Sequence, residues 1–167
     1  MSVTNLSEET FKFKYIAIEK DSEGCGFPVP LKFADYKDKK IVITGAPAAF
    51  SPTCSITHIP GYIEKLQQLL DKGVDDVLVV TVDNPFANNA WAKQLGIKDT
   101  SNIKFVTDPA CKFTKSLGYE LDGGDGTFSC GRYAVVVDKG KFIYSEQEEN
   151  PASEVTKSGV DAVLAVL

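Results

Sequence analysis

The sequence predicts an α/β fold in which helices cover both faces of a mixed central sheet. Short apolar, β-branched runs alternate with segments of helical spacing along most of the chain, and parallel strands need crossover helices between them. Near the C-terminus, two apolar runs flank Asp138-Lys139-Gly140, a pattern typical of a β-hairpin. The sheet is therefore expected to contain both parallel and antiparallel strands.

The N-terminal part is expected to form a strand, a loop and a buried strand. Apolar and polar side chains alternate over Phe11–Ile18, which predicts a half-buried strand. The Gly- and Pro-containing segment Asp21–Pro30 predicts a loop, and this loop carries Cys25. The run Ile41–Gly45 is apolar and β-branched and closes with glycine, so it predicts a second strand that is fully buried.

The middle of the chain is expected to continue with a helix, a strand and a helix. A helix is predicted from about Cys54 to Leu70, and Pro60-Gly61 is expected to kink or divide it. The apolar run Asp76–Val82 predicts another buried strand. Pro85–Gly96 begins with proline and ends with glycine, as helices often do.

The last third is expected to complete the sheet. A strand is predicted at Ile103–Val106 and a short helix at Ala110–Leu117. The hairpin strands are Tyr133–Val137 and Lys141–Tyr144, and an amphipathic helix is predicted at Ser158–Leu167.

Length, composition and charge bound the class of protein. A chain of 167 residues with 43% hydrophobic residues can bury its own core, so residues 1–167 are expected to form a single domain. The net charge of −5 argues against nucleic acids and anionic membranes as partners. The N-terminus lacks a basic region followed by an apolar one, so we expect a cytoplasmic location. The C-terminal Ala165-Val166-Leu167 lacks the basic middle residue of a Ser-Lys-Leu peroxisomal signal.

The cysteines indicate redox chemistry rather than metal binding. The four cysteines stand at positions 25, 54, 111 and 130 without a Cys-x-x-Cys pair, and the chain has one histidine. This supply is poor for a zinc site and differs from a thioredoxin-like dithiol motif. In a reducing compartment, a disulfide between such thiols is expected to be transient and catalytic.

Cys54 is the leading candidate for a reactive thiol. It follows a turn fixed by Pro47 and Pro52 and is expected at a helix start, where unpaired amides and the helix dipole favour an anion. The Ser51 hydroxyl and the amides of Thr53 and Cys54 would point toward whatever the sulfur attacks. The alternative interpretation is an inert buried thiol with Ser51 as a helix cap.

This turn resembles the peroxidatic signature of peroxiredoxins, Pro-x-x-x-Ser/Thr-x-x-Cys, which Pro47, Ser51 and Cys54 meet. Further motifs make the chain similar to the peroxiredoxin-5 subfamily, and most similar to its fungal thioredoxin-dependent alkyl hydroperoxide reductases. These motifs are Phe50-Ser51-Pro52-Thr53-Cys54, His58-Ile59-Pro60-Gly61-Tyr62, Asp83-Asn84-Pro85-Phe86, Ala90-Trp91 and Gly131-Arg132-Tyr133. The resemblance extends from about Tyr15 to Leu167. It implies a thioredoxin-like fold and no metal, haem or flavin cofactor.

The resemblance also implies roles for the residues around Cys54. The Cys54 thiolate would attack a hydroperoxide and become a sulfenic acid. Arg132 would favour the thiolate and donate hydrogen bonds to a peroxide oxygen. The Ser51 hydroxyl and the Thr53 amide would bind the substrate, and Pro47 would shield the sulfenic acid.

Three further features have open interpretations. Phe50, Phe86 and Trp91 would line an apolar collar for alkyl hydroperoxides, or else belong to the core or to a dimer interface. His58 lies four residues after Cys54, and we favour a structural or supporting role over a Cys-His catalytic pair. The run Glu146-Gln147-Glu148-Glu149 is expected to form a solvated acidic face.

The sulfenic acid must be resolved by another thiol. The position of Cys25 resembles the resolving cysteine of the fungal enzymes, which bonds the peroxidatic cysteine of the partner subunit. Cys130 is the rival, and Cys111 is expected to be a packing residue.

The sequence therefore predicts a thioredoxin-dependent peroxiredoxin that reduces hydrogen peroxide and alkyl hydroperoxides as a homodimer. One alternative is a one-cysteine peroxidase recycled by glutathione or glutaredoxin. A second is a peroxide-sensing relay that passes its oxidation to a client protein, and a third is a non-catalytic binding module with an inert Cys54.

Overall fold

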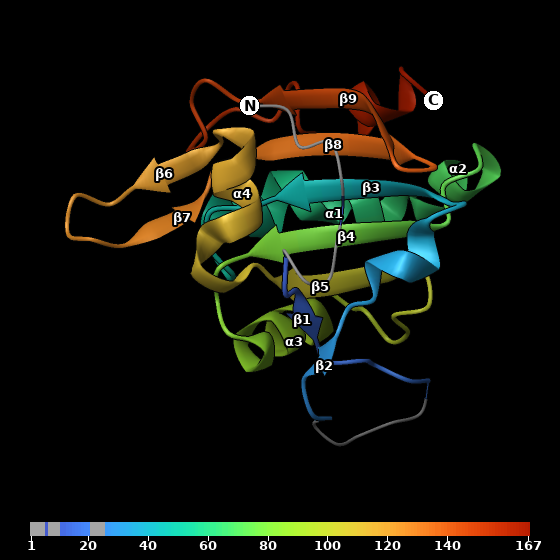
Figure 1. The fold of residues 1–167 in the computed structure, drawn as a ribbon, viewed down its shortest axis with the longest axis horizontal. Coiled ribbons are helices and arrows are strands. Elements are labelled where there is room, and N and C mark those ends of the chain that lie inside the picture. Colours follow the sequence, from blue (N-terminus) through green and yellow to red (C-terminus); the bar gives the residue numbers. More distant parts are fainter. Residues whose placement is uncertain (1–5, 7–10, 21–25) are drawn as a thin grey trace.

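The computed structural model describes residue 6 and residues 11–20 and 26–167. Its central feature is a seven-stranded sheet with the order β2-β1-β5-β4-β3-β8-β9 (Figure 1). The bounds are β1 Lys14–Tyr15, β2 Val29–Pro30, β3 Lys40–Gly45, β4 Asp76–Thr81, β5 Ile103–Thr107, β8 Tyr133–Asp138 and β9 Lys141–Gln147. Strands β3, β4 and β5 run parallel, whereas the remaining neighbours pair antiparallel. The predicted mixed sheet is confirmed.

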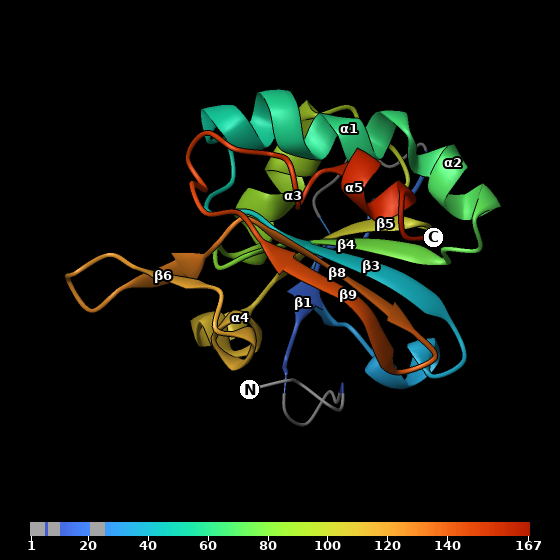
Figure 2. The ribbon, with the colours of Figure 1, turned by 90° about the horizontal axis from the view of Figure 1, so that it is seen from above.

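Helices lie on both faces of this sheet, as predicted. Figure 2 shows α1, α2, α3 and α5 over one face and α4 on the other. Their bounds are α1 Ile59–Glu64, α2 Leu66–Asp71, α3 Pro85–Gln94, α4 Lys112–Leu117 and α5 Val160–Leu164. Two short 3-10 turns, η1 at Phe33–Tyr36 and η3 at Pro109–Cys111, complete the helical elements together with the segment that carries Cys54.

The two faces have separate apolar cores, because side chains alternate along each strand. On β3, Val42 belongs to the core under α1, α2, α3 and α5, while Ile41 and Ile43 belong to the core that contains Phe113 of α4. Cys54 lies in the first core and Cys130 in the second. The sheet therefore separates the two thiols.

The helical segment after β3 differs from the prediction in how it begins and in where it is divided. It begins with a π-helix, η2, at Cys54–His58, and the Ile59 amide donates to the Cys54 carbonyl five residues earlier. Pro60 stands in the first turn of α1, directly after this wide turn. Proline lacks an amide donor and its ring crowds the carbonyl four residues earlier, which a π turn accommodates. The division falls instead at Lys65, whose φ and ψ of −101° and 16° separate α1 from α2.

Two predicted elements are shorter than expected. Of Phe11–Ile18, only Lys14 and Tyr15 form a strand. The alternation reflects burial of apolar side chains such as Phe13, 0% exposed, more than it reflects strand pairing. The last helix starts at Val160 instead of residue 158, because the amide and hydroxyl of Ser158 are bound by a carboxylate from outside the helix.

The turns confirm one hairpin and add another. Lys139 and Gly140 both have positive φ, 51° and 82°, as a two-residue turn between β8 and β9 requires. A second hairpin joins β6, Glu120–Asp122, to β7, Phe128–Cys130, outside the main sheet. Within the described residues, the structure has no helix long and apolar enough to cross a membrane.

Candidate active site

Cys54 lies at the end of a tightly held loop that follows β3. The Ala46 amide donates to the Val80 carbonyl over 2.9 Å, and the Ala49 amide donates to Asp83 Oδ2 over 2.8 Å. These bonds attach the loop to β4 and to the segment before α3. Cys54 is the first residue of η2, and its side chain is 0% exposed. The thiol is therefore fixed in a buried place instead of standing on the surface.

The glycine that ends β3 is required by close packing. A Cβ atom on Gly45 would lie 2.1 Å from Cε1 of Tyr133, the residue that pairs with it on β8. This distance is far below any van der Waals contact, so a side chain at position 45 would displace the ring. Arg132 directly precedes Tyr133 in the sequence. Because Gly45 has no side chain, Tyr133 keeps its position on β8, and the backbone position of Arg132 is kept with it.

Arg132 contacts the Cys54 sulfur. Its Nη2 donates to Cys54 Sγ over 3.2 Å, its Nη1 lies 2.8 Å from His58 Nδ1, and its Nε donates to the Pro151 carbonyl over 2.7 Å. All three guanidinium nitrogens are therefore engaged, and the side chain is 1% exposed. The structure brings together the two residues that the sequence singled out, although they stand 78 positions apart.

His58 holds the guanidinium from the side away from the sulfur. Burial, together with the charge of Arg132, lowers the pKa of His58 to about 3, so the imidazole is neutral at physiological pH. Because Arg132 can only donate, Nδ1 is the acceptor and the proton lies on Nε2. Nε2 in turn faces Thr44 Oγ1 at 2.8 Å and the Ser158 carbonyl at 3.2 Å. His58 therefore lies between Arg132 on one side and Thr44 and Ser158 on the other, and its supporting role stays a prediction.

Glu148 fixes the loop that meets both His58 and Arg132. Its Oε1 accepts bonds from the Lys157 amide at 2.6 Å and from the Ser158 amide at 2.7 Å, and Thr156 Oγ1 donates to its Oε2. Burial acts to raise the pKa of Glu148, but these hydrogen bonds outweigh it and hold the pKa below its usual value. The expected solvated acidic face is wrong at this position, since Glu148 is only 2% exposed.

The residues of the loop before Cys54 have different surroundings. The Ser51 hydroxyl oxygen is buried and has no hydrogen-bond partner among the described residues, so it is available to a ligand. The Thr53 hydroxyl donates to the Ala152 carbonyl over 2.5 Å, which ties the loop to the Glu148 segment. Pro47 is half-buried beside them.

The aromatic residues near the site divide into exposed and buried groups. Phe50 and Phe86 are 49% and 54% exposed. Trp91 is fully buried, donates through Nε1 to Ser55 Oγ over 2.9 Å and packs edge-on against Phe105. Phe50 has a backbone φ of 63°, and its ring centroid lies 6.5 Å from that of Trp91. Trp91 is thus a core residue that supports the π-helix.

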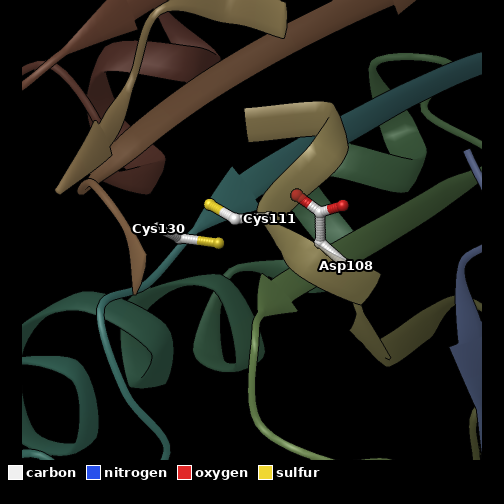
Figure 3. Close-up of side chains that lie close together, drawn as sticks. All are labelled: Asp108, Cys111 and Cys130. Carbon is white, nitrogen blue, oxygen red and sulfur yellow. The ribbon is translucent and has the colours of Figure 1, made fainter. Parts of the chain in front are cut away.

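The two other cysteines that the structure describes, Cys111 and Cys130, are not in contact with Cys54. Cys25 lies outside the described residues, so its geometry does not enter the site. Cys111 and Cys130 lie beside each other and beside Asp108 (Figure 3), in the core on the opposite face of the sheet. Among the described residues, these three form a group whose ligand atoms lie within 4.8 Å of one another. The sequence left Cys130 as the rival of Cys25 for resolving Cys54, and the structure places Cys130 and Cys54 in cores on opposite faces of the sheet.

Comparisons with known proteins find one family and relatives that are described as peroxiredoxins. The profile of the Redoxin family matches residues 11–164. A protein of Lipomyces kononenkoae described as "Putative peroxisomal peroxiredoxin" is 42% identical over 171 residues, which cover 99% of this chain and 100% of that protein. Peroxiredoxin Pen c 3 of Penicillium citrinum is 38% identical and covers 84% of this chain and 83% of its own length.

A solved structure extends this likeness to three dimensions. Reduced Prx3 of Vibrio vulnificus in complex with hydrogen peroxide is 28% identical, with a TM-score of 0.76 and full coverage of both chains. The thioredoxin-like α/β fold implied by the sequence resemblance is thereby confirmed. The expected cytoplasmic location is contradicted, because the Lipomyces relative carries a peroxisomal description.

Proposed function

The chain belongs to the Redoxin family and is a peroxiredoxin, a thiol peroxidase, and from this premise we propose that Cys54 is the peroxidatic cysteine. The observation that carries the proposal is the 3.2 Å contact between Arg132 Nη2 and Cys54 Sγ. The guanidinium is permanently charged and fixed beside the sulfur, so its N–H groups can stabilise the negative charge that moves between sulfur and oxygen during attack on a peroxide.

The reaction follows from this arrangement. The Cys54 thiolate attacks one oxygen of ROOH, the S–O bond forms, the O–O bond breaks, and RO⁻ takes up a proton and leaves as the alcohol. Cys54 becomes a sulfenic acid. Negative charge moves from sulfur to the leaving oxygen, and Arg132 can donate to both atoms because its fork carries several N–H groups. Preorganised donors at such a place are usually the largest single catalytic contribution.

Ser51 and the start of the helical segment are proposed to bind the peroxide. The Ser51 hydroxyl is a buried donor that has no partner among the residues the structure describes, and buried polar groups without partners are rare unless a ligand or water meets them. The amides of Thr53 and Cys54 stand in the first turn, where helical amides lack intrahelical acceptors. Pro47 and Phe50 belong to the same loop, Pro47 half-buried and Phe50 exposed, and we assign them to exclusion of water and to contact with the R group.

His58 and Glu148 are proposed to position Arg132. The neutral imidazole accepts from Nη1, and Glu148 holds the loop whose Pro151 carbonyl accepts from Nε. The guanidinium is thereby held through Nη1 and Nε, and its Nη2 faces the Cys54 sulfur. In the part of the chain that the structure describes, neither side chain forms a hydrogen bond to Cys54, so we propose that their effect on catalysis passes through Arg132.

The remaining cycle is proposed from the sequence resemblance. The sulfenic acid of Cys54 condenses with the Cys25 thiol of a partner subunit, the S–S bond forms, and hydroxide leaves as water. Thioredoxin then reduces the disulfide. Exposed apolar side chains around the site, Phe50, Ile56 and Phe86 at 49%, 72% and 54% exposure, support a homodimer in which a second copy covers this surface.

The first experiment separates peroxidase activity from its recycling. One equivalent of tert-butyl hydroperoxide is added to reduced protein, and the products are mapped by mass spectrometry after non-reducing electrophoresis. A covalent dimer through Cys54 and Cys25 supports the two-cysteine cycle. A monomer with only sulfenylated Cys54 supports the one-cysteine alternative, and unmodified Cys54 contradicts the peroxidatic assignment.

A matched set of variants completes the test. Cys54→Ser is expected to abolish catalytic turnover of hydroperoxide with thioredoxin, whereas Cys111→Ser retains it. Cys25→Ser is expected to abolish turnover with thioredoxin while leaving one stoichiometric reaction with peroxide. Continued turnover of Cys25→Ser with glutaredoxin would support the one-cysteine enzyme. Mixed disulfides of oxidised Cys54 with one client protein, combined with slow turnover, would support the relay.

We propose a peroxisomal location on the strength of the Lipomyces relative. The expected result is that a fluorescent protein fused to the N-terminus of the chain co-localises with a peroxisomal matrix marker. Diffuse fluorescence throughout the cell would contradict the proposal.

A further inference from the structure

A second pair of thiols lies on the face of the sheet opposite Cys54. Cys111 ends η3 and Cys130 ends β7, and the two side chains are 1% and 0% exposed. Their sulfurs and a carboxylate oxygen of Asp108 all lie within 4.8 Å of one another. Figure 3 shows the two sulfurs between the chain segments that carry them, with the Asp108 carboxylate on the other side of Cys111. The two cysteines are therefore placed for chemistry with each other.

The surroundings favour a dithiol over a metal site. Asp108 Oδ1 accepts from the Phe113 amide and Oδ2 from the Thr114 amide, each over 2.9 Å. This carboxylate caps the start of α4, and both of its oxygens are engaged. Structural zinc sites use four ligands, mostly Cys and His, whereas the group here supplies two sulfurs and a carboxylate that is already bound.

The electrostatics distinguish the two sulfurs. A hydrogen bond from Cys130 lowers the pKa of the Cys111 thiol, and Lys115 lowers it further, although burial and Asp108 act against them. The same hydrogen bond, together with burial, raises the pKa of the Cys130 thiol. Thr114 Oγ1 lies 3.2 Å from Cys130 Sγ. The directions of these pKa shifts support Cys111 as the nucleophile of the pair.

The backbone at Cys111 has an unusual, left-handed conformation. Ala110 and Cys111 have φ values of 56° and 58°, and two consecutive non-glycine residues in the left-handed region are strained by about 1–2 kcal/mol each. The Cys111 amide donates to the Asp108 carbonyl over 3.1 Å and closes this turn. The turn directs the Cys111 side chain toward β7, where Cys130 stands.

We propose that Cys111 and Cys130 form a second redox centre, which closes to an intramolecular disulfide when hydroperoxide is in excess. The Cys111 thiolate attacks ROOH, the S–O bond forms, the O–O bond breaks, and ROH leaves. Cys130 sulfur then attacks the sulfenic sulfur, the S–S bond forms, the S–O bond breaks, and water leaves. In total, ROOH and two thiols give one disulfide, ROH and H₂O. The peroxide that the enzyme family reduces is the oxidant.

The two centres respond to different conditions. Both thiols of the pair are buried and, among the described residues, no arginine contacts their sulfurs, so peroxide reaches them through local opening of η3 and β7. Oxidation of the pair is therefore slower than oxidation of Cys54 and reports sustained exposure to peroxide. Because the sheet lies between the two centres, the pair does not need Cys54 to close.

The test uses the full chain with Cys25→Ser and Cys54→Ser, which leaves only the two thiols of the pair. The reduced protein is treated with excess tert-butyl hydroperoxide, blocked with N-ethylmaleimide in denaturant and digested with trypsin. Cleavage after Lys104, Lys112, Lys115 and Arg132 gives one peptide for each cysteine. The expected product is residues 105–112 linked to residues 116–132, and dithiothreitol releases it into the two separate peptides.

Two comparisons keep the result interpretable. In the unaltered protein, the same linked peptide is expected to appear after Cys54 has been oxidised. It is expected to be lost in Cys111→Ser and in Cys130→Ser, and near-ultraviolet circular dichroism shows whether each variant is folded. Recovery of both cysteines as separate N-ethylmaleimide adducts, or as separate sulfinic acids, after prolonged exposure to a large excess of peroxide over the amount that fully oxidises Cys54 would overturn the proposal. This outcome would leave the proposed role of Cys54 intact.

Discussion

The two faces of the central sheet hold buried cysteines in opposite chemical settings. Cys54 faces a guanidinium that is held on two sides, whereas Cys111 and Cys130 face each other, a threonine hydroxyl and a carboxylate. Burial is nearly complete for all three thiols, so burial does not distinguish them. The partner of the sulfur does distinguish them: Cys54 lies beside a fixed cation, as proposed for attack on peroxide, whereas Cys111 and Cys130 lie beside each other, as proposed for disulfide formation.

The largest expected effect tests the cation itself. Arg132→Lys is expected to lower kcat/KM for hydroperoxide roughly 100-fold, as loss of a preorganised donor does in other enzymes. A single ammonium cannot contact Cys54, His58 and the Pro151 carbonyl at the same time. The rate is measured by stopped-flow consumption of tert-butyl hydroperoxide. Cys111→Ser is the control and keeps the parent rate, and an unchanged rate in Arg132→Lys would remove the guanidinium from the proposed chemistry.

The next effect concerns the support of that cation. Glu148→Gln is expected to lower the free energy of unfolding by about 2 kcal/mol, because a buried carboxylate that accepts several hydrogen bonds is lost. It should also lower the peroxidase rate, since the loop that holds Arg132 loosens. Urea denaturation measures the first effect. Glu149→Gln is the matched control, because the neighbouring side chain is 82% exposed and its ion pair contributes little. Equal stability of the two variants would contradict the role of Glu148.

A smaller effect appears as a pH dependence. His58 has a pKa of about 3 in the folded protein against an ordinary 6.5, so the unfolded chain binds the proton first as pH falls. Stability is then lost from about pH 6.5 downward, by at most about 1.4 kcal/mol per pH unit. His58→Gln is expected to lack this part of the dependence.

Urea denaturation at several pH values checks this prediction through the difference between the two curves. Glu148 contributes in the same direction, and the raised pKa values of Asp76 and Asp108 act in the opposite one. These groups are present in both proteins and cancel in the difference. Parallel curves would contradict a neutral, buried His58.

The smallest effect is expected on the other face of the sheet. Ala110→Gly relieves a left-handed residue beside Cys111 and is expected to raise stability by about 0.5–1 kcal/mol, after the entropy cost of glycine is subtracted. The peroxidase rate stays unchanged. Ala92→Gly, inside α3, is the matched control and is expected to lower stability by about 1 kcal/mol. A destabilised Ala110→Gly would indicate that the turn at Cys111 is not strained.

The sequence predicts best what is local. The buried strands β3 and β4, the hairpin at Lys139 and Gly140, and the helix that begins at Pro85 each carry their own signal in a few neighbouring residues, and all are observed. The predicted first strand is mostly absent. The alternation over residues 11–18 arises because Phe11 and Phe13 are buried in a core, while only Lys14 and Tyr15 pair with neighbouring strands.

The candidate site is predictable only where a motif spans it. Cys54 and its loop form one continuous segment, and Arg132 was found through the resemblance and not through its own pattern. The buried role of Glu148 carries no sequence signal, because an acidic run is typical of solvated surface and only the fold encloses one of its members. The proximity of Cys111 to Cys130 likewise depends on two left-handed residues and on the β6–β7 hairpin, which the local sequence does not predict.

The π turn at Cys54–His58 has a consequence for how this chain tolerates changes in length. It contains one residue more than an α-helical turn would, and the Cys54 carbonyl bonds the amide five positions on. Deletion of a single residue here would restore a regular helix and rotate Cys54 by about 100° relative to His58. The sulfur would then face away from the guanidinium, although the helix itself would be intact. Insertions and deletions are therefore expected to be rejected within these five residues, while the exposed turn of the β6–β7 hairpin can absorb them.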